Sequence, residues 1–279
     1  MNVKQLSTTL KVRLICDFFQ NIIVTAFLPF IALYLTDMVN QRFAGLFLFI
    51  LVIINFPISL ISGHIIERLP KKTLTLTYQL ILSMMLIVMA FSTSKHSALI
   101  AIFCIAYAIF SITIGMQQPV MDTIIMDAIT PEVEHYIYKI SYWLTNIAVT
   151  LGALIGGLMY SAHKSLLFLI AFVIYMTVFI ALYIWLPKDL NKVNELSVQD
   201  SKQTRFSMKQ ILHSYKPAFK DTTYLLLIVG FSILTMGELS ASSYISIRLK
   251  QEFDPITLFS LHITLSLIHI SEPTRPLYI

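Results

Sequence analysis

The chain has 279 residues, of which 57% are hydrophobic and 13% are charged, and its formal net charge at pH 7 is +5. Soluble domains carry about 25% charged residues, so this composition excludes an ordinary water-soluble protein. The basic residues do not gather on one soluble face, so we expect no nucleic-acid partner.

Long apolar runs recur along the chain. A helix that crosses a bilayer needs about 20 apolar residues, and seven stretches satisfy this length: 14–36, 43–66, 74–92, 98–121, 140–160, 166–186 and 224–247. An eighth run begins near Ile256 and stops. The runs lack strict period-two alternation, so they indicate helices rather than barrel strands. The sequence predicts an all-α, polytopic membrane protein.

The connections between these runs differ in basic content. Lysine and arginine concentrate before the first run, in 68–72 and in 187–223, whereas the opposite connections hold only Arg42, Lys95, Lys164, Arg248 and Lys250. By the positive-inside rule we expect the N-terminus and the 187–223 linker to be cytoplasmic, in a multi-pass protein of the cell membrane. The spacing predicts a six-helix bundle over 1–186, a linker over 187–223 and the start of a second bundle over 224–264.

The stretch after the second run reads GHIIERLPKK, residues 63–72. It resembles the signature of the major facilitator superfamily between helices 2 and 3, Gly-x-x-x-Asp-Arg-x-Gly-Arg/Lys-Lys. Four positions match the signature: Gly63, Arg68, Lys71 and Lys72. Glu67 stands in place of its Asp, and Pro70 in place of its second Gly.

A second stretch, 126–157, resembles the helix 4 to helix 5 region of multidrug-proton antiporters in that superfamily. The residues that carry the likeness are Asp127-Ala128, Tyr142-Trp143, Gly152, Gly156 and Gly157. Ala153 differs from the antiporter pattern, which has Pro there. The resemblance implies the major facilitator fold of two six-helix halves, and a secondary transporter that exports small, drug-like cationic or amphipathic molecules in exchange for protons.

The resemblance also implies a gating charge network, in which Asp127 joins Glu67 and Arg68 at the cytoplasmic surface. Lys71 and Lys72 either belong to this network or are plain positive-inside anchors. Gly152, Gly156 and Gly157 continue a face of small residues that allows close helix packing.

Acidic residues inside apolar spans are costly and therefore mark function. Glu238 lies past the middle of the 224–247 run, and we expect it to accept and release a proton as access alternates. Asp17, in the first run, either lines a polar cavity or pairs with Arg13. Asp122, close behind Gln118, either joins the cavity or faces water. These four residues, Glu238, Asp122, Asp17 and Gln118, form the predicted proton and substrate pathway.

Residues 265–275 read LSLIHISEPTR, which is the translation of a transposase-type library adapter. We therefore expect 265–279 to be a sequencing artefact, and the chain to be a fragment of a twelve-helix protein.

Other functions compete with this interpretation. The same fold transports sugars, peptides and osmolytes. A literal count of seven spans would suit a receptor or sensor, although the seventh has no lysine for a retinal Schiff base. An enzyme would need clusters of His, Asp or Glu inside the membrane. We expect no enzymatic activity, no cofactor and no metal site; the expected partners are a small-molecule substrate, protons and the lipid bilayer, with the protein as a monomer.

Overall fold

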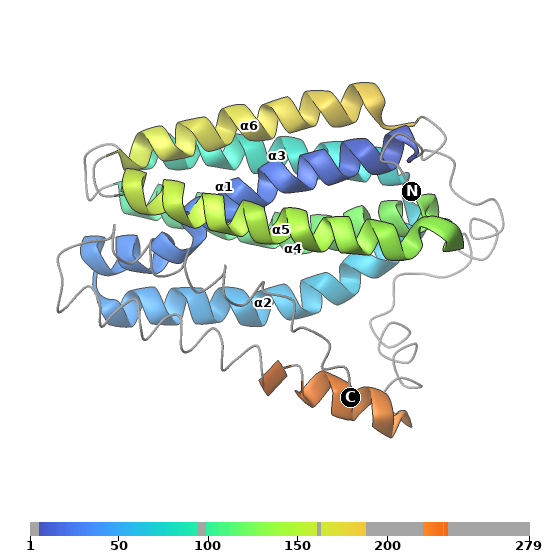
Figure 1. The fold of residues 1–279 in the computed structure, drawn as a ribbon. Coiled ribbons are helices and arrows are strands. Elements are labelled where there is room, and N and C mark those ends of the chain that lie inside the picture. Colours follow the sequence, from blue (N-terminus) through green and yellow to red (C-terminus); the bar gives the residue numbers. More distant parts are fainter. Residues whose placement is uncertain (1–5, 94–98, 161–162, 188–219, 231, 234–279) are drawn as a thin grey trace, which may run out of the picture.

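The computed structural model describes residues 6–93, 99–160, 163–187, 220–230 and 232–233, apart from the side chains at 56, 60 and 67 (Figure 1). Six long helices make up most of this part: α1 (Thr8–Met38), α2 (Gln41–Arg68), α3 (Lys71–Ser92), α4 (Ile100–Ala128), α5 (Pro131–Tyr160) and α6 (Lys164–Trp185). All six are long and apolar enough to cross a membrane. The all-α, polytopic fold class is confirmed.

The helices are longer than the apolar runs that predict them. α5 begins at Pro131 rather than at residue 140, since proline suits the first helical position and Glu132 and Glu134 favour the first turn. α1 begins at Thr8, where the side chain of Ser7 accepts a hydrogen bond from the Leu10 amide at 3.3 Å. An apolar run marks the part of a helix long and apolar enough to span the membrane, whereas capping residues set the ends of the helix.

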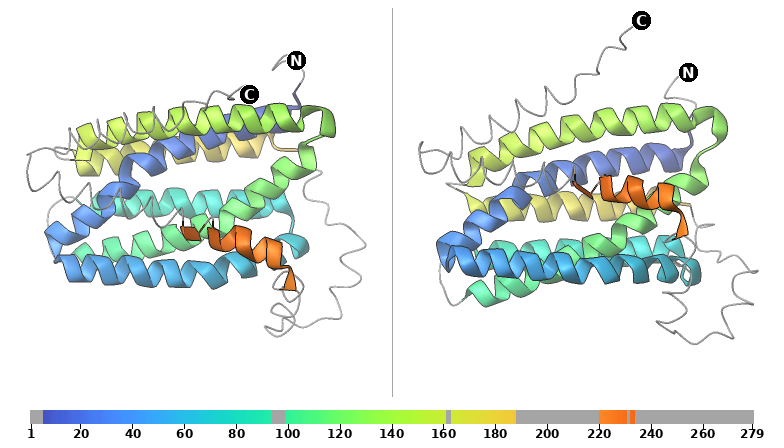
Figure 2. Two further views of the ribbon diagram at one scale, coloured as in Figure 1. Left: turned by 60° about the horizontal axis from the view of Figure 1, so that its bottom comes forward. Right: turned by 90° about the horizontal axis from the view of Figure 1, so that it is seen from below.

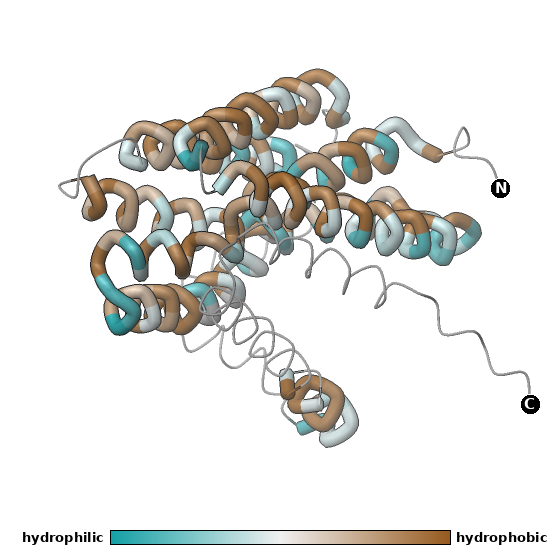
Figure 3. The backbone as a smooth tube through the Cα atoms, turned by 60° about the vertical axis from the view of Figure 1, so that its left-hand side comes forward, coloured by the Kyte–Doolittle hydropathy of each residue, from teal (hydrophilic) through white to brown (hydrophobic). Residues whose placement is uncertain are grey.

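The six helices run side by side in alternating directions, and the right view of Figure 2 shows α1 between α5 and α6, with α2 at the far edge of the bundle. α3 packs against α4 and α6, and α2 packs against α4. An aromatic core joins them, in which the Phe27 ring lies 5.4 Å from those of Phe110 and Phe168. Hydrophobic residues dominate the helices in Figure 3.

The two ends of the bundle differ in character. At one end α1, α3 and α5 begin and α2, α4 and α6 end; we call it the basic end because it holds Lys11, Arg68, Lys71 and Lys72. We call the other the opposite end. Of the predicted seventh span, 224–247, residues 224–230 and 232–233 are described and helical, and their apolar side chains are mostly exposed. Most of the linker, Glu238 and the 265–279 tail lie outside the described residues.

Candidate functional site

A charged cluster lies between α1 and α4 near the basic end; it consists of Arg13, Asp17 and Asp122. Arg13 is only 2% exposed, forms an ion pair with Asp17 one turn along α1, and donates from Nε to the carbonyl oxygen of Met121 at 3.4 Å. Asp122, the next residue on α4, interacts electrostatically with Arg13. A buried cation is tolerated only with such partners, and Arg13 links α1 to α4 through its bond to the Met121 carbonyl.

The α4 side of the cluster opens to the surface of the bundle. Asp122 and Gln118 are both exposed, and Gln118 Nε2 donates to Asp122 Oδ1 at 3.1 Å. Their face of α4 is left uncovered by the other described helices. A carboxylate placed in this way can exchange a proton or contact a solute while it remains attracted to a buried guanidinium.

Three amides form a glutamine cluster farther into the bundle. Gln79 Oε1 on α3 accepts from Gln20 Nε2 on α1 at 2.8 Å and from Gln117 Nε2 on α4 at 2.7 Å. Gln79 Nε2 donates to the carbonyl oxygen of Tyr175 on α6 at 3.0 Å. Gln79 lies eight residues after Lys71, about 12 Å along the helix axis, well inside a hydrocarbon core of about 30 Å. The cluster is therefore a polar centre shared by four helices.

The sequence indicates Asp17, Asp122 and Gln118 as candidate residues of the proton and substrate pathway. It gives no indication of the role of Gln79 or of the burial of Arg13. The signal for Gln79 is a single amide within the apolar run LTYQLILS. Arg13 is read as a cytoplasmic anchor because it precedes the first apolar run, whereas α1 begins five residues earlier and carries it into the bundle.

The signature residues between α2 and α3 are separated by the structure. The stretch from Gly63 to Arg68 is the last part of α2 rather than a loop, and only Leu69 and Pro70 connect it to α3. Lys71 Nζ lies 2.5 Å from Asp127 Oδ2 at the end of α4, and both side chains are partly exposed. The side chain of Glu67 lies outside the described residues, and so does its part in the expected network.

Lys72 does not share the Asp127 contact. It is 7% exposed, and its Nζ donates to the carbonyl oxygens of Tyr183 at 3.0 Å and Leu186 at 2.5 Å, at the end of α6. A surface anchor would keep its ammonium group in water. The interpretation of Lys72 as a plain anchor therefore does not fit its burial.

The small-residue face of α5 lies against α1. A Cβ atom at Gly152 would overlap the carbonyl oxygen of Ile22, and one at Gly156 would overlap that of Ala26 and lie 2.7 Å from the Phe30 ring. Gly157 is also buried. The two backbones approach each other at positions where only glycine leaves enough space.

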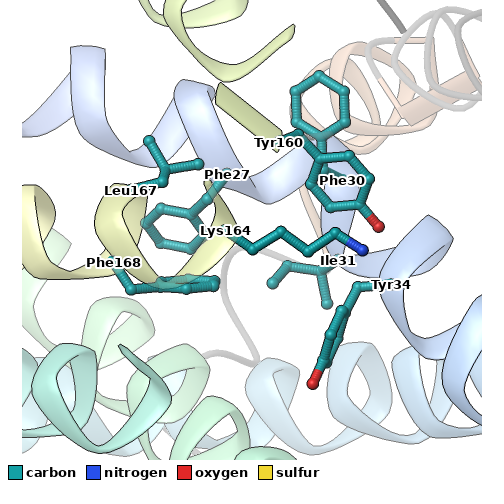
Figure 4. A pocket seen from close by; sticks show the side chains of 8 residues that line it. All are labelled: Phe27, Phe30, Ile31, Tyr34, Tyr160, Lys164, Leu167 and Phe168. Carbon is teal, nitrogen blue, oxygen red and sulfur yellow. The ribbon is translucent and has the colours of Figure 1, made fainter. Parts of the chain in front are cut away.

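A small cavity lies at the opposite end, between α1, α5 and α6 (Figure 4). The Lys164 side chain extends between two tyrosine rings, with Nζ 4.5 Å from the Tyr160 ring centroid and 5.4 Å from that of Tyr34. The cavity has room for about one water molecule, so it cannot hold a transported solute of larger size.

Across the part of the chain that the structure describes, no group of three or more His, Cys, Asp or Glu side chains could hold a metal ion. The candidate site is therefore one of charges and amides. It extends from the Lys71–Asp127 pair at the basic end, through the charged cluster, to the glutamine cluster.

Comparison with known proteins identifies the family. The model of the Major Facilitator Superfamily matches residues 13–271. A Na(+), Li(+), K(+)/H(+) antiporter of Planococcus maritimus is 21% identical over 260 residues, which cover 92% of this chain and 61% of that protein. The chain thus spans less than two thirds of the relative's length. Six membrane-capable helices with this match show that the chain belongs to the Major Facilitator Superfamily.

Proposed function

We propose that this chain is part of a secondary active transporter that works by alternating access and couples solute movement to protons. The observation that carries the proposal is the buried Arg13, which forms an ion pair with Asp17 and donates to the carbonyl oxygen of Met121, next to the exposed Asp122. Protonation of either acid would leave the buried guanidinium less well compensated, which costs several kcal/mol in a low-dielectric interior. The proton would therefore shift the balance between conformations in which the cluster is closed and open.

Monovalent cations are the first substrate class that we propose. The antiporter relative is named for Na(+), Li(+) and K(+) exchange, and the exposed Asp122 and Gln118 offer the oxygen ligands that hard cations prefer. Drug-like cations are the second class, because the α4–α5 region resembles multidrug-proton antiporters. Both classes would be attracted by the same carboxylate.

The Lys71–Asp127 pair is the proposed gate at the basic end, together with Arg68 and Glu67. The pair is partly exposed, and such pairs contribute only about 0.2–1 kcal/mol. A contact of this strength can break and reform in every transport cycle, whereas the buried Arg13 contacts cannot be lost without replacement.

Several features of the whole protein are proposals that rest on the sequence. We propose a monomer in the cell membrane with the basic end cytoplasmic, a six-helix bundle over 1–186, a linker over 187–223 and a second bundle starting at 224. The relative is longer than the segment matched here, and from the adapter-like tail we propose that the protein departs from this sequence after Thr264. Glu238 is proposed as a second proton-carrying residue.

Everted membrane vesicles from cells that express the full gene test the proposal. Respiration acidifies the vesicles, and a pH-sensitive dye then reports proton release after addition of Na⁺, Li⁺, K⁺ or a cationic dye. We expect at least one cation to release protons well above the vector control. Equal responses with and without the protein for every cation would contradict proton-coupled cation transport; Glu238→Gln in the same assay tests the role of Glu238.

A further inference from the structure

The two adjacent lysines at the start of α3 point to different partners. Lys71 reaches the side chain of Asp127 on α4, at the surface. Lys72 is buried and reaches the backbone at the end of α6, where its ammonium also lies 5.9 Å from the Tyr183 ring centroid. The two lysines therefore join the start of α3 to the ends of α4 and α6.

The end of α6 needs the charge that Lys72 supplies. The last carbonyl groups of a helix lack partners within it and carry partial negative charge. α6 has no basic residue in its own last turn, so the cation comes from another helix. An ammonium group has three donors, and Lys72 uses two of them on the carbonyls of Tyr183 and Leu186.

The position of Lys72 does not help its own helix. It lies in the first turn of α3, where positive charge opposes the helix dipole. Burial of a lysine also has a desolvation cost. Among the described residues, the hydrogen bonds that offset both costs are those to the end of α6, which indicates that the role of Lys72 lies at that helix end.

We propose that Lys72 is a positioning residue that fixes the carboxyl end of α6, and with it the point where the linker leaves the bundle at Pro187. Lys71 is adjacent to Lys72, so a break of the Lys71–Asp127 pair moves the start of α3. The contacts of Lys72 then transmit this movement to the end of α6, where the linker begins. This goes beyond the proposed function, since it concerns how the bundle holds the linker and does not require any particular substrate or ion.

Hydrogen exchange at the end of α6 tests the proposal in lipid nanodiscs that contain the full gene product. Lys72→Met removes both charged hydrogen bonds to the carbonyls, so we expect exchange of the 183–186 amides to accelerate at least about tenfold. Lys72→Arg should restore most of the protection. The proposal would be overturned if the 183–186 amides of Lys72→Met exchanged at the wild-type rate. It would also be overturned if Lys72→Met and Lys72→Arg accelerated exchange equally.

A second variant tests the transmission step without touching Lys72. Asp127→Asn weakens the exposed pair, and it should accelerate exchange at the end of α6 by about two- to fivefold. Trp185, the last residue of α6, provides an independent reading, because Trp143→Phe leaves it as the one tryptophan of the chain. Its emission should shift in Lys72→Met. Unchanged α6 exchange in Asp127→Asn would overturn the transmission from Lys71 to the linker.

Discussion

α1 presents two different interfaces to its neighbours. Toward α5 it packs through shape, with glycines against its backbone and the Phe30 and Tyr160 rings stacked at 4.8 Å. Toward α3 and α4 it packs through the aromatic contact of Phe27 with Phe110 and, in addition, through polar groups, the charged cluster and the glutamine cluster. Close packing of two backbones allows a single arrangement of the helices. Ionisable groups at an interface allow two states, which differ in whether an acid is protonated. We therefore propose that α1 and α5 form a fixed unit and that the contact of α1 with α4 responds to protonation.

Removal of Arg13 should have the largest effect on stability. Arg13→Leu leaves Asp17 and the Met121 carbonyl without their cation, and breaking a buried pair costs about 3–5 kcal/mol. Chemical unfolding in detergent, followed by circular dichroism, measures the change. Arg13→Leu/Asp17→Asn removes both charges and should recover part of the loss; a single variant as stable as the wild type would show that the polar interface is not held by this pair.

A larger side chain at Gly156 should break the α1–α5 interface. Gly156→Leu forces its Cβ into the Ala26 carbonyl, and overpacking of this kind costs about 1–3 kcal/mol. Gly45→Leu is the matched control, because a Cβ at Gly45 meets nothing within 4 Å. The same unfolding assay should separate the two variants; equal stabilities would mean that the close approach is not required.

Loss of Gln79 should have a smaller effect. Gln79→Leu removes the acceptor shared by Gln20 and Gln117, and hydrogen bonds between membrane helices contribute about 0.6–2 kcal/mol. Gln118→Leu, on an exposed position of α4, is the matched control. Thermal unfolding should rank Gln79→Leu below Gln118→Leu, and the reverse order would deny the glutamine cluster its stabilising role.

The exposed pair at the basic end should affect stability least. Lys71→Gln should lower the free energy of unfolding by no more than about 1 kcal/mol, and Asp127→Asn should do the same. The double variant Lys71→Gln/Asp127→Asn should be no less stable than the less stable of the two single variants, because each single change already removes the same interaction. Additive losses in unfolding experiments would show that the two residues act separately.

The sequence predicts the apolar parts of the helices well, because lipid requires continuous apolar length. It predicts the ends poorly, as at Pro131, because capping residues rather than hydropathy set them. The acids Asp17 and Asp122 stand out as charges in spans. Gln79 and Arg13 do not, since their burial depends on which helix faces meet, and that depends on packing across distant segments.

The linkage between Asp122 and proton movement is the central claim, and one comparison tests it most directly. In everted vesicles bearing the full gene product, Asp122→Asn should abolish cation-induced proton release, while Glu134→Gln, which alters an exposed acid in the first turn of α5, should leave it intact. Expression of both variants is checked in the same membranes. Proton release at the wild-type level in Asp122→Asn would contradict the account.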